Sequence, residues 1–217
     1  MSQMVRLTNF RKLEAKGELG VILGRLMLVM NDLSIANDAL GLWMEDQPRG
    51  IRTTRAKGAK MYFVRVMIGH VFEALQIINK IKTTPELTRI IDGAPRPIRL
   101  HFNACVKVIG TNDYLLMRKM RNDASFHYLD QTVRSAISSQ AQKAPDMSLA
   151  LQVGDTTLGW YYEPGERIID SIVVRGVLAI PEGAPVQPTV DDLIHRMQQV
   201  GDHLAHFGGY FIMEYGR

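Results

Sequence analysis

Side chains capable of acid–base chemistry gather in one short stretch of the chain. The segment 117–130, MRKMRNDASFHYLD, holds Arg121, Asn122 and His127 within seven residues. A histidine titrates near neutral pH and can accept or donate a proton there, and an arginine is a planar, permanently charged group suited to phosphate oxygens. These residue types favour a metal-free reaction at a phosphodiester, in which one group moves a proton and another neutralises the charge on phosphorus.

RNA is the substrate class that this chemistry fits. The 2′-hydroxyl of RNA is an internal nucleophile that needs a base, and the pentacoordinate phosphate needs fixed positive charge around its oxygens. We expect His127 to take or give the proton and Arg121 to hold the phosphate. Asn122 can hydrogen-bond either of them and so fix its position.

A helix is expected to position these side chains. At roughly 100° per residue, an α-helix over 114–128 places Arg121 at one border of an apolar strip and His127 at the other. The strip consists of Met117, Met120 and Ala124. Such a strip needs a partner to cover it, so two copies of the helix packed along it would gather two arginines and two histidines in one cleft.

The same residues also permit a purely structural interpretation. A histidine in the last turn of a helix is favoured by the helix dipole. Asp123 is spaced four residues before His127 and can form an ion pair with it. On spacing alone, a salt-bridged helix end therefore stays open beside the catalytic site.

Apolar residues recur at helical spacing along most of the chain, which predicts a mainly α protein. The helices expected are 18–45, 55–82, 86–91, 98–109, 114–128, 130–143 and 190–207. A small β-hairpin is expected around residues 147–163, where Gly154 provides the turn. The segment 167–180 contains β-branched residues but has helical spacing, and we favour a helix there. A Pro-rich linker, 181–188, precedes the last helix.

The arrangement expected from these segments is an antiparallel helical bundle with a β-hairpin appendage. Several helices joined by short connections before residue 145 pack most simply as antiparallel neighbours. We therefore expect a bundle over residues 1–145. Residues 146–217 would add the hairpin and C-terminal helices that pack on the bundle, in the same domain or as a small appendage.

Positive charge is concentrated rather than spread evenly. The chain of 217 residues has a formal net charge of +4, and the stretch 49–60 alone holds five cations and no acid. Such a stretch can follow a phosphate backbone because counterion release drives the binding. We expect Arg52 and Arg55 to contact RNA, together with Arg118 and Lys119 beside the central motif. A solvated loop and first helical turn would give the same pattern.

Several classes of protein do not fit the sequence. Cys105 is the single cysteine, so no intramolecular disulfide can form, and the N-terminus lacks the apolar run of a secretory signal. The most apolar windows are interrupted by charged residues, so we expect a cytoplasmic protein that does not span a membrane. Repeated Glu-x-x-His pairs are missing from the sequence, and we expect neither a metal nor a cofactor.

The run Arg121-Asn122, four further residues and His127 resembles the signature of the HEPN superfamily. In that superfamily an arginine is followed directly by a polar residue, and a histidine comes a few positions later. The resemblance covers residues 18–143 as a helical bundle, with RNDASFHY as its specific part. Tyr128 directly follows the histidine, whereas the HEPN toxins paired with nucleotidyltransferases place their tyrosine one residue further on.

This resemblance implies a metal-independent endoribonuclease that acts as a homodimer with a composite site. Arg121 and His127 match the catalytic pair, Asn122 matches the polar position, and Tyr128 is expected to contact RNA. Such proteins often belong to toxin–antitoxin or phage-defence systems, so an antitoxin or another protein is a further expected partner. Two alternatives stay open: a catalytically inactive HEPN-like module that binds a nucleotide, RNA or protein, and a plain helical interaction domain.

Overall fold

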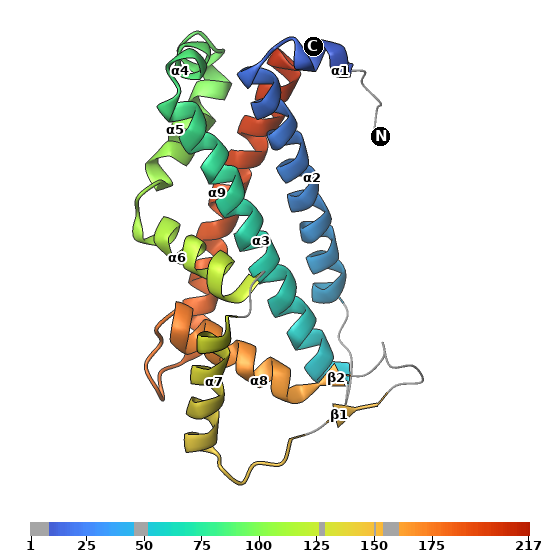
Figure 1. The fold of residues 1–217 in the computed structure, drawn as a ribbon, viewed down its shortest axis with the longest axis vertical. Helices are drawn as coiled ribbons and strands as arrows, with labels where there is room; N and C mark the ends of the chain where they lie inside the picture. Colours follow the sequence, from blue (N-terminus) through green and yellow to red (C-terminus); the bar gives the residue numbers. More distant parts are fainter. Residues whose placement is uncertain (1–8, 46–51, 126–128, 150, 154–160) are drawn as a thin grey trace. The chain divides into compact units, whose positions relative to one another are not determined.

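The computed structural model describes residues 9–45, 52–125, 129–149, 151–153 and 161–217, and these residues are mainly helical (Figure 1). The helices are α1 (Phe10–Glu14), α2 (Glu18–Glu45), α3 (Arg52–Thr83), α4 (Pro85–Asp92), α5 (Arg96–Val108), α6 (Asn112–Met120), α7 (Asp130–Lys143), α8 (Glu163–Ser171) and α9 (Val186–Tyr215). Two π-helical segments, η1 (Arg121–Ser125) and η3 (Ile172–Val177), continue α6 and α8. The mainly α class expected from the sequence is confirmed.

The chain divides into two compact units, each assembled from separate stretches of sequence. Unit 1 comprises Met1–Ile35, His70–Tyr114 and Ile194–Arg217, and unit 2 comprises Ala36–Gly69 and Leu115–Leu193. Each unit has a buried apolar core. Unit 1 buries Leu23, Leu26, Leu75, Ile78, Leu204, Phe207 and Phe211, and unit 2 buries Ile68, Met117, Met120, Ala136, Ile169, Ile172 and Val173. The expected domain boundary at residue 145 stays a prediction.

The long helices form where apolar residues recur at helical spacing. In α2 the buried side chains include Ile22, Leu26 and Val29, which follow the i, i+4, i+7 repeat of one helix face. Cys105 lies on the buried face of α5, and burial raises the pKa of its thiol to about 12. This thiol is a core group that packs as a small apolar side chain.

The last helix is longer than its sequence indicates. It begins at Val186, inside the expected linker, and continues through Gly208 and Gly209 to Tyr215 instead of ending at Phe207. At Gly208 a Cβ atom would lie 2.9 Å from the Sδ atom of Met30, so the glycine allows a close approach of α2. Two glycines cost a helix about 2 kcal/mol. Burial of an aromatic side chain beyond them, Phe211, contributes a stabilisation of similar size.

The predictions for two other segments, the helix after residue 166 and the β-hairpin, are only partly confirmed. The segment 167–180 is helical as far as Val177, as favoured, and it changes from α-helix to π-helix at Ile172. β1 (Leu151–Gln152) pairs with β2 (Tyr161–Tyr162) in antiparallel register, Leu151 opposite Tyr162. Residues 154–160, which would form the turn, lie outside the described residues, so the hairpin stays a prediction.

Within the described part of the chain, two helices are long and apolar enough to cross a membrane. They are Glu18–Leu42 of α2 and Gly58–Thr83 of α3. Length and composition alone give this result, and a buried helix in the core of a soluble protein has the same properties. The expectation that the chain does not span a membrane therefore stays a prediction.

Candidate functional site

The candidate motif lies where an α-helix changes into a π-helix. α6 ends at Met120 and η1 begins at Arg121. The Ser125 hydroxyl oxygen lies 3.1 Å from the Met120 carbonyl, five residues earlier, which is the longer of two contacts that share its single hydrogen. The wider turn rotates each residue less about the helix axis than an α-helix does, so the expected 100° spacing holds only as far as Met120. Single π-turns of this kind recur at functional sites.

The apolar strip of the motif is buried in the core of unit 2. Met117, Met120 and Ala124 are at most 2% exposed. The sequence predicted their shared face correctly, but the expected packing of two motif helices along this strip was wrong, because residues of the same chain already cover it. The motif helix therefore has its polar groups on the remaining, more accessible side.

On that side, Arg121 and Asn122 contact each other. The Arg121 Nη1 atom donates a hydrogen bond to the Asn122 Oδ1 atom over 3.3 Å. Arg121 is half-buried and Asn122 is exposed. The asparagine can thus orient the guanidinium group beside it.

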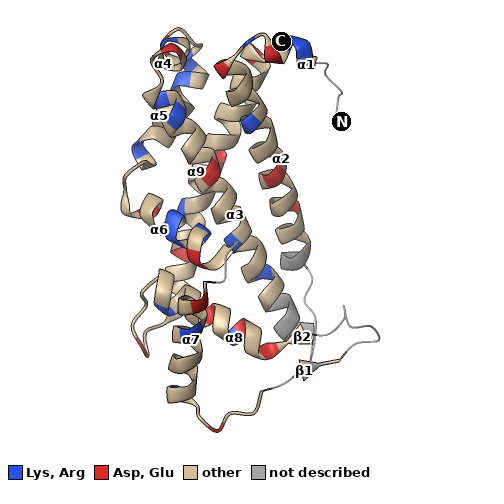
Figure 2. Ribbon diagram, in the orientation of Figure 1, with Lys and Arg blue, Asp and Glu red and all other residues tan. Residues whose placement is uncertain are grey.

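Two further cations lie one turn earlier, in the last turn of α6. Arg118 and Lys119 are both exposed, and Figure 2 shows basic residues at this end of α6. The Lys119 Nζ atom donates a hydrogen bond to the Gly176 carbonyl of η3 over 2.5 Å. An ammonium group has three donors, so Lys119 keeps capacity for an anion while it holds η3.

The other predicted site residues cannot be placed. His127 and Tyr128 lie outside the described residues, as do the side chains of Arg52 and Arg55 at the start of α3. Their roles in catalysis and RNA binding stay predictions.

A buried arginine holds the end of η1, and the sequence analysis did not single it out. Arg65 of α3 is 4% exposed, and its Nη1 atom donates a hydrogen bond of 2.7 Å to the Ala124 carbonyl. In return, the Ser125 hydroxyl donates a bond of 2.8 Å to the Arg65 carbonyl. These two bonds fix the backbone of the motif two residues before His127. We call them the Arg65–η1 contact.

Two acids on α8 compensate the buried charge of Arg65. Glu166 and Asp170 are one turn apart, and burial raises the pKa of each carboxyl group. For Glu166 the neighbouring Asp170 raises the pKa further, while Arg65 lowers the pKa of both acids. Asp170 keeps an exposed edge, yet the protein around its carboxyl group is sufficient to disfavour the charge.

The environment of Glu166 is tightly packed. The Tyr161 hydroxyl hydrogen-bonds its carboxyl group, which lowers the pKa against the larger effect of burial. A Cβ atom at Gly58 would lie 2.5 Å from the Tyr161 hydroxyl and 2.7 Å from the Glu166 carboxyl carbon. Gly58 therefore allows these two groups to pack directly on α3.

Sequence signals for this cluster existed but were weak. Arg65 interrupts the apolar stripe of α3, and a charged residue there needs partners when the face is buried. Glu166 and Asp170 have the i, i+4 spacing of neighbours on one helix face. Neither signal shows that a residue 59 positions later would supply the partner of Arg65.

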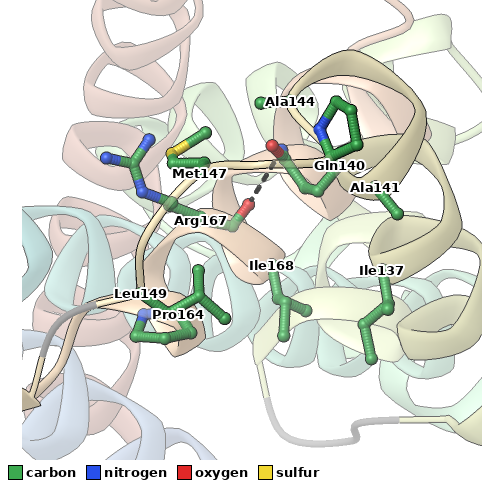
Figure 3. Close-up of a pocket in the computed structure, with 10 residues that line it drawn as sticks. Ile137, Gln140, Ala141, Ala144, Met147, Leu149, Pro164, Arg167 and Ile168 are labelled. Carbon is green, nitrogen blue, oxygen red and sulfur yellow. Dashed lines mark hydrogen bonds between the residues drawn. The ribbon is translucent and has the colours of Figure 1, made fainter.

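A separate pocket in unit 2 is mostly apolar. It has a volume of about 200 Å³ and lies between α7, α8 and the segment after α7, with Ile137, Ala141, Met147, Leu149 and Ile168 in its lining. Figure 3 shows the hydrogen bond of 3.5 Å from Gln140 to the Arg167 carbonyl. The Arg167 guanidinium group pairs with Glu163 and points away from Ile137. The described lining thus offers apolar contacts with few polar groups to direct chemistry.

Histidines form a second cluster, in unit 1. The Nδ1 atoms of His101 and His203 lie 3.0 Å apart, and the His101 ring stacks on His206 at 4.8 Å. Burial lowers the pKa of His101, and the charges of His206 and His203 lower it further. Among the described residues, no group of three histidine, cysteine or acidic side chains is arranged to hold a metal ion. Elsewhere in unit 1, the Nδ1 atom of His70 lies 3.6 Å from a carboxylate oxygen of Asp32.

Comparison of the chain with protein-family models, curated proteins and solved structures gave no match.

Proposed function

We propose that the chain is a metal-independent endoribonuclease of HEPN type, which cleaves RNA in a composite site of a homodimer. The observation that carries the proposal is the Arg65–η1 contact. A buried arginine and a reciprocal serine bond hold a π-turn whose accessible side carries Arg121 and Asn122. Buried polar groups that hold a single turn in place are typical of a segment that must keep side chains in a set geometry.

The residues of the chain supply what the reaction requires. His127 removes the proton of a 2′-hydroxyl, whose oxygen forms a bond to the adjacent phosphorus while the bond from phosphorus to the 5′-oxygen breaks. The leaving oxygen takes a proton from the second histidine of the dimer, which leaves a 2′,3′-cyclic phosphate and a 5′-hydroxyl. Arg121, oriented by Asn122, binds the phosphate oxygens as negative charge builds up on them.

The remaining basic residues would bind the RNA on either side of the cleaved bond. Arg118 and Lys119 are exposed in the turn before Arg121. Arg52, Arg55 and Tyr128 are further candidates from the sequence. A ribonuclease of this kind would act in toxin–antitoxin or phage defence, with an antitoxin or another protein restraining it in the cytoplasm.

The test uses purified full-length chain and mixed RNA in the presence of EDTA. We expect cleavage by the unmodified protein, and a loss of at least about 100-fold in His127→Ala and Arg121→Ala, the size expected when a general base or a phosphate-binding group is removed. His195→Ala, which changes a histidine outside the motif, should cleave as the unmodified protein does.

Other outcomes would overturn the catalytic proposal. RNA retention that depends on Arg121 without any cleavage would identify a binding module. Equal cleavage by all variants would identify a contaminating nuclease. Neither cleavage nor binding would leave the motif as a structural helix end.

A further inference from the structure

The outer face of α2 in unit 1 carries exposed apolar side chains at a constant interval. Val21, Leu28 and Ile35 are 56%, 67% and 68% exposed, and each follows the previous one by seven residues. The same interval continues along the helix to Leu42, which is 70% exposed. The opposite face of α2 is buried in the core of its own chain. The helix thus presents apolar residues on two sides, and the described residues cover one of them.

A seven-residue interval places these side chains along a nearly straight line. In an α-helix, two residues that are seven positions apart differ by only about 20° in their direction around the helix axis. A line of this kind is the seam along which two helices pack. Isolated exposed leucines need no explanation, but a regular line along one helix indicates a surface that another molecule covers.

The charges beside this line argue against a lipid as that molecule. Arg25 and Asp32 are exposed, and each follows an apolar residue of the line by four positions, which places both on the same border. Asn31 is exposed on the opposite border. Each charge placed in the middle of a bilayer costs about 2.5 to 3.5 kcal/mol. A protein surface with complementary charges fits this face better.

We propose that the face is covered by α2 of a second copy of this chain, packed antiparallel about a two-fold axis near Leu28. In this arrangement Leu28 packs against its own equivalent, and Val21 packs against Ile35 of the second copy. Antiparallel helices bring the same border of each together. Arg25 of one copy therefore meets Asp32 of the other, and the two-fold axis repeats this pair.

The charges also select the antiparallel orientation. In a parallel pair, the border with Arg25 and Asp32 would face the opposite border, which holds Gly24, Asn31 and Asp38. Asp38 would lie thirteen residues along the helix from Arg25, so neither charge would gain a nearby partner of opposite sign. Asp32 lies 3.6 Å from the His70 Nδ1 atom and is 51% exposed. A carboxylate has two oxygens and can accept from both groups, so the contact with His70 leaves Asp32 able to pair with a second copy.

Cysteine cross-linking tests this geometry directly, because Cys105 is buried and does not interfere. Under mild oxidation we expect Leu28→Cys chains to form disulfide-linked dimers. Val21→Cys chains alone should not link, whereas a mixture of Val21→Cys and Ile35→Cys chains should. Linking of Val21→Cys chains with themselves, as efficiently as Leu28→Cys chains, would overturn the antiparallel arrangement.

A charge exchange gives an independent result. Arg25→Asp and Asp32→Arg should each lower the dimer fraction in sedimentation equilibrium, and the double variant should restore it. Failure of the double variant to restore the dimer, or a monomer at every concentration, would overturn the proposal. If the chain sediments with phosphatidylcholine vesicles and Leu28→Ser abolishes this co-sedimentation, the face is a lipid contact instead. These readouts do not involve RNA cleavage, so this proposal and the ribonuclease proposal can fail separately.

Discussion

Replacement of Arg65 by methionine tests whether the Arg65–η1 contact positions the motif. Methionine is a long, unbranched side chain that fills much of the same space without the charge. The Ala124 carbonyl then loses its hydrogen bond of 2.7 Å in a buried environment, which costs about 1 to 3 kcal/mol. Glu166 and Asp170 lose the cation that favours their ionised forms.

The expected total is a loss of about 3 kcal/mol in the free energy of unfolding, since breaking a buried charge cluster typically costs about 3 to 5 kcal/mol. Arg167→Met is the matched control. Arg167 lies on α8, and its charge also lowers the pKa of Asp170, but it is exposed and pairs with Glu163 at the surface. Its replacement should cost no more than about 1 kcal/mol.

Urea unfolding followed by circular dichroism measures both variants. RNA cleavage is then measured at a temperature where both variants are folded, so that a loss of activity reports the position of the motif and not unfolding of the chain. Arg65→Met should lose cleavage, whereas Arg167→Met should keep it. Adding Glu166→Gln and Asp170→Asn to Arg65→Met should recover part of the stability without restoring cleavage. An Arg65→Met cost equal to that of Arg167→Met would refute the reasoning.

Three further predictions follow from the packing and the pKa shifts. Burial raises the pKa of Glu166 above 4.5, so the folded chain binds this proton more tightly than the unfolded chain, and stability should decline as the pH rises above 4.5. Asp170, whose pKa is also raised, contributes in the same direction, so Glu166→Gln should reduce the decline in urea titrations at several pH values. The pKa of His101 is lowered below 6.5, so the unfolded chain binds the proton more tightly, and stability should be lost as the pH falls below 6.5; in His101→Gln the melting temperature should depend less on pH over this range. At Gly41 a Cβ atom would meet open space, so Gly41→Ala should stabilise the chain by about 0.5 to 1 kcal/mol. Gly58→Ala must displace Tyr161 and Glu166 and should therefore destabilise it. Equal effects of the two variants on the melting temperature would contradict the packing around Gly58.

The sequence predicted the long helices because their apolar faces repeat at helical spacing. α2 and α3 lie close to their expected ranges, and the burial of Met117, Met120 and Ala124 follows from the same periodicity. The extension of α9 past Gly208 was missed because local propensity opposes it. Contact with Met30, far away in sequence, decides it instead.

The details of the candidate site depend on contacts that periodicity does not show. A π-turn has no distinct apolar repeat of its own, and η1 is held by hydrogen bonds with Arg65, about 60 residues earlier. Arg121 and Asn122 were identified by residue type and adjacency, whereas Arg65, Glu166 and Asp170 required the fold. The sequence thus indicated the candidate groups, and the structure adds Arg65, which holds the turn that carries two of them.

The most direct test of the ribonuclease proposal is the response of cleavage to a single hydroxyl group. An RNA oligonucleotide that the chain cleaves in EDTA is compared with the same oligonucleotide carrying hydrogen in place of the 2′-hydroxyl at the cleaved position. We expect cleavage of the first only, with a 2′,3′-cyclic phosphate on the upstream fragment by mass spectrometry. Equal cleavage of both, or cleavage only after a divalent metal is added, would contradict attack by the 2′-hydroxyl in a metal-free site.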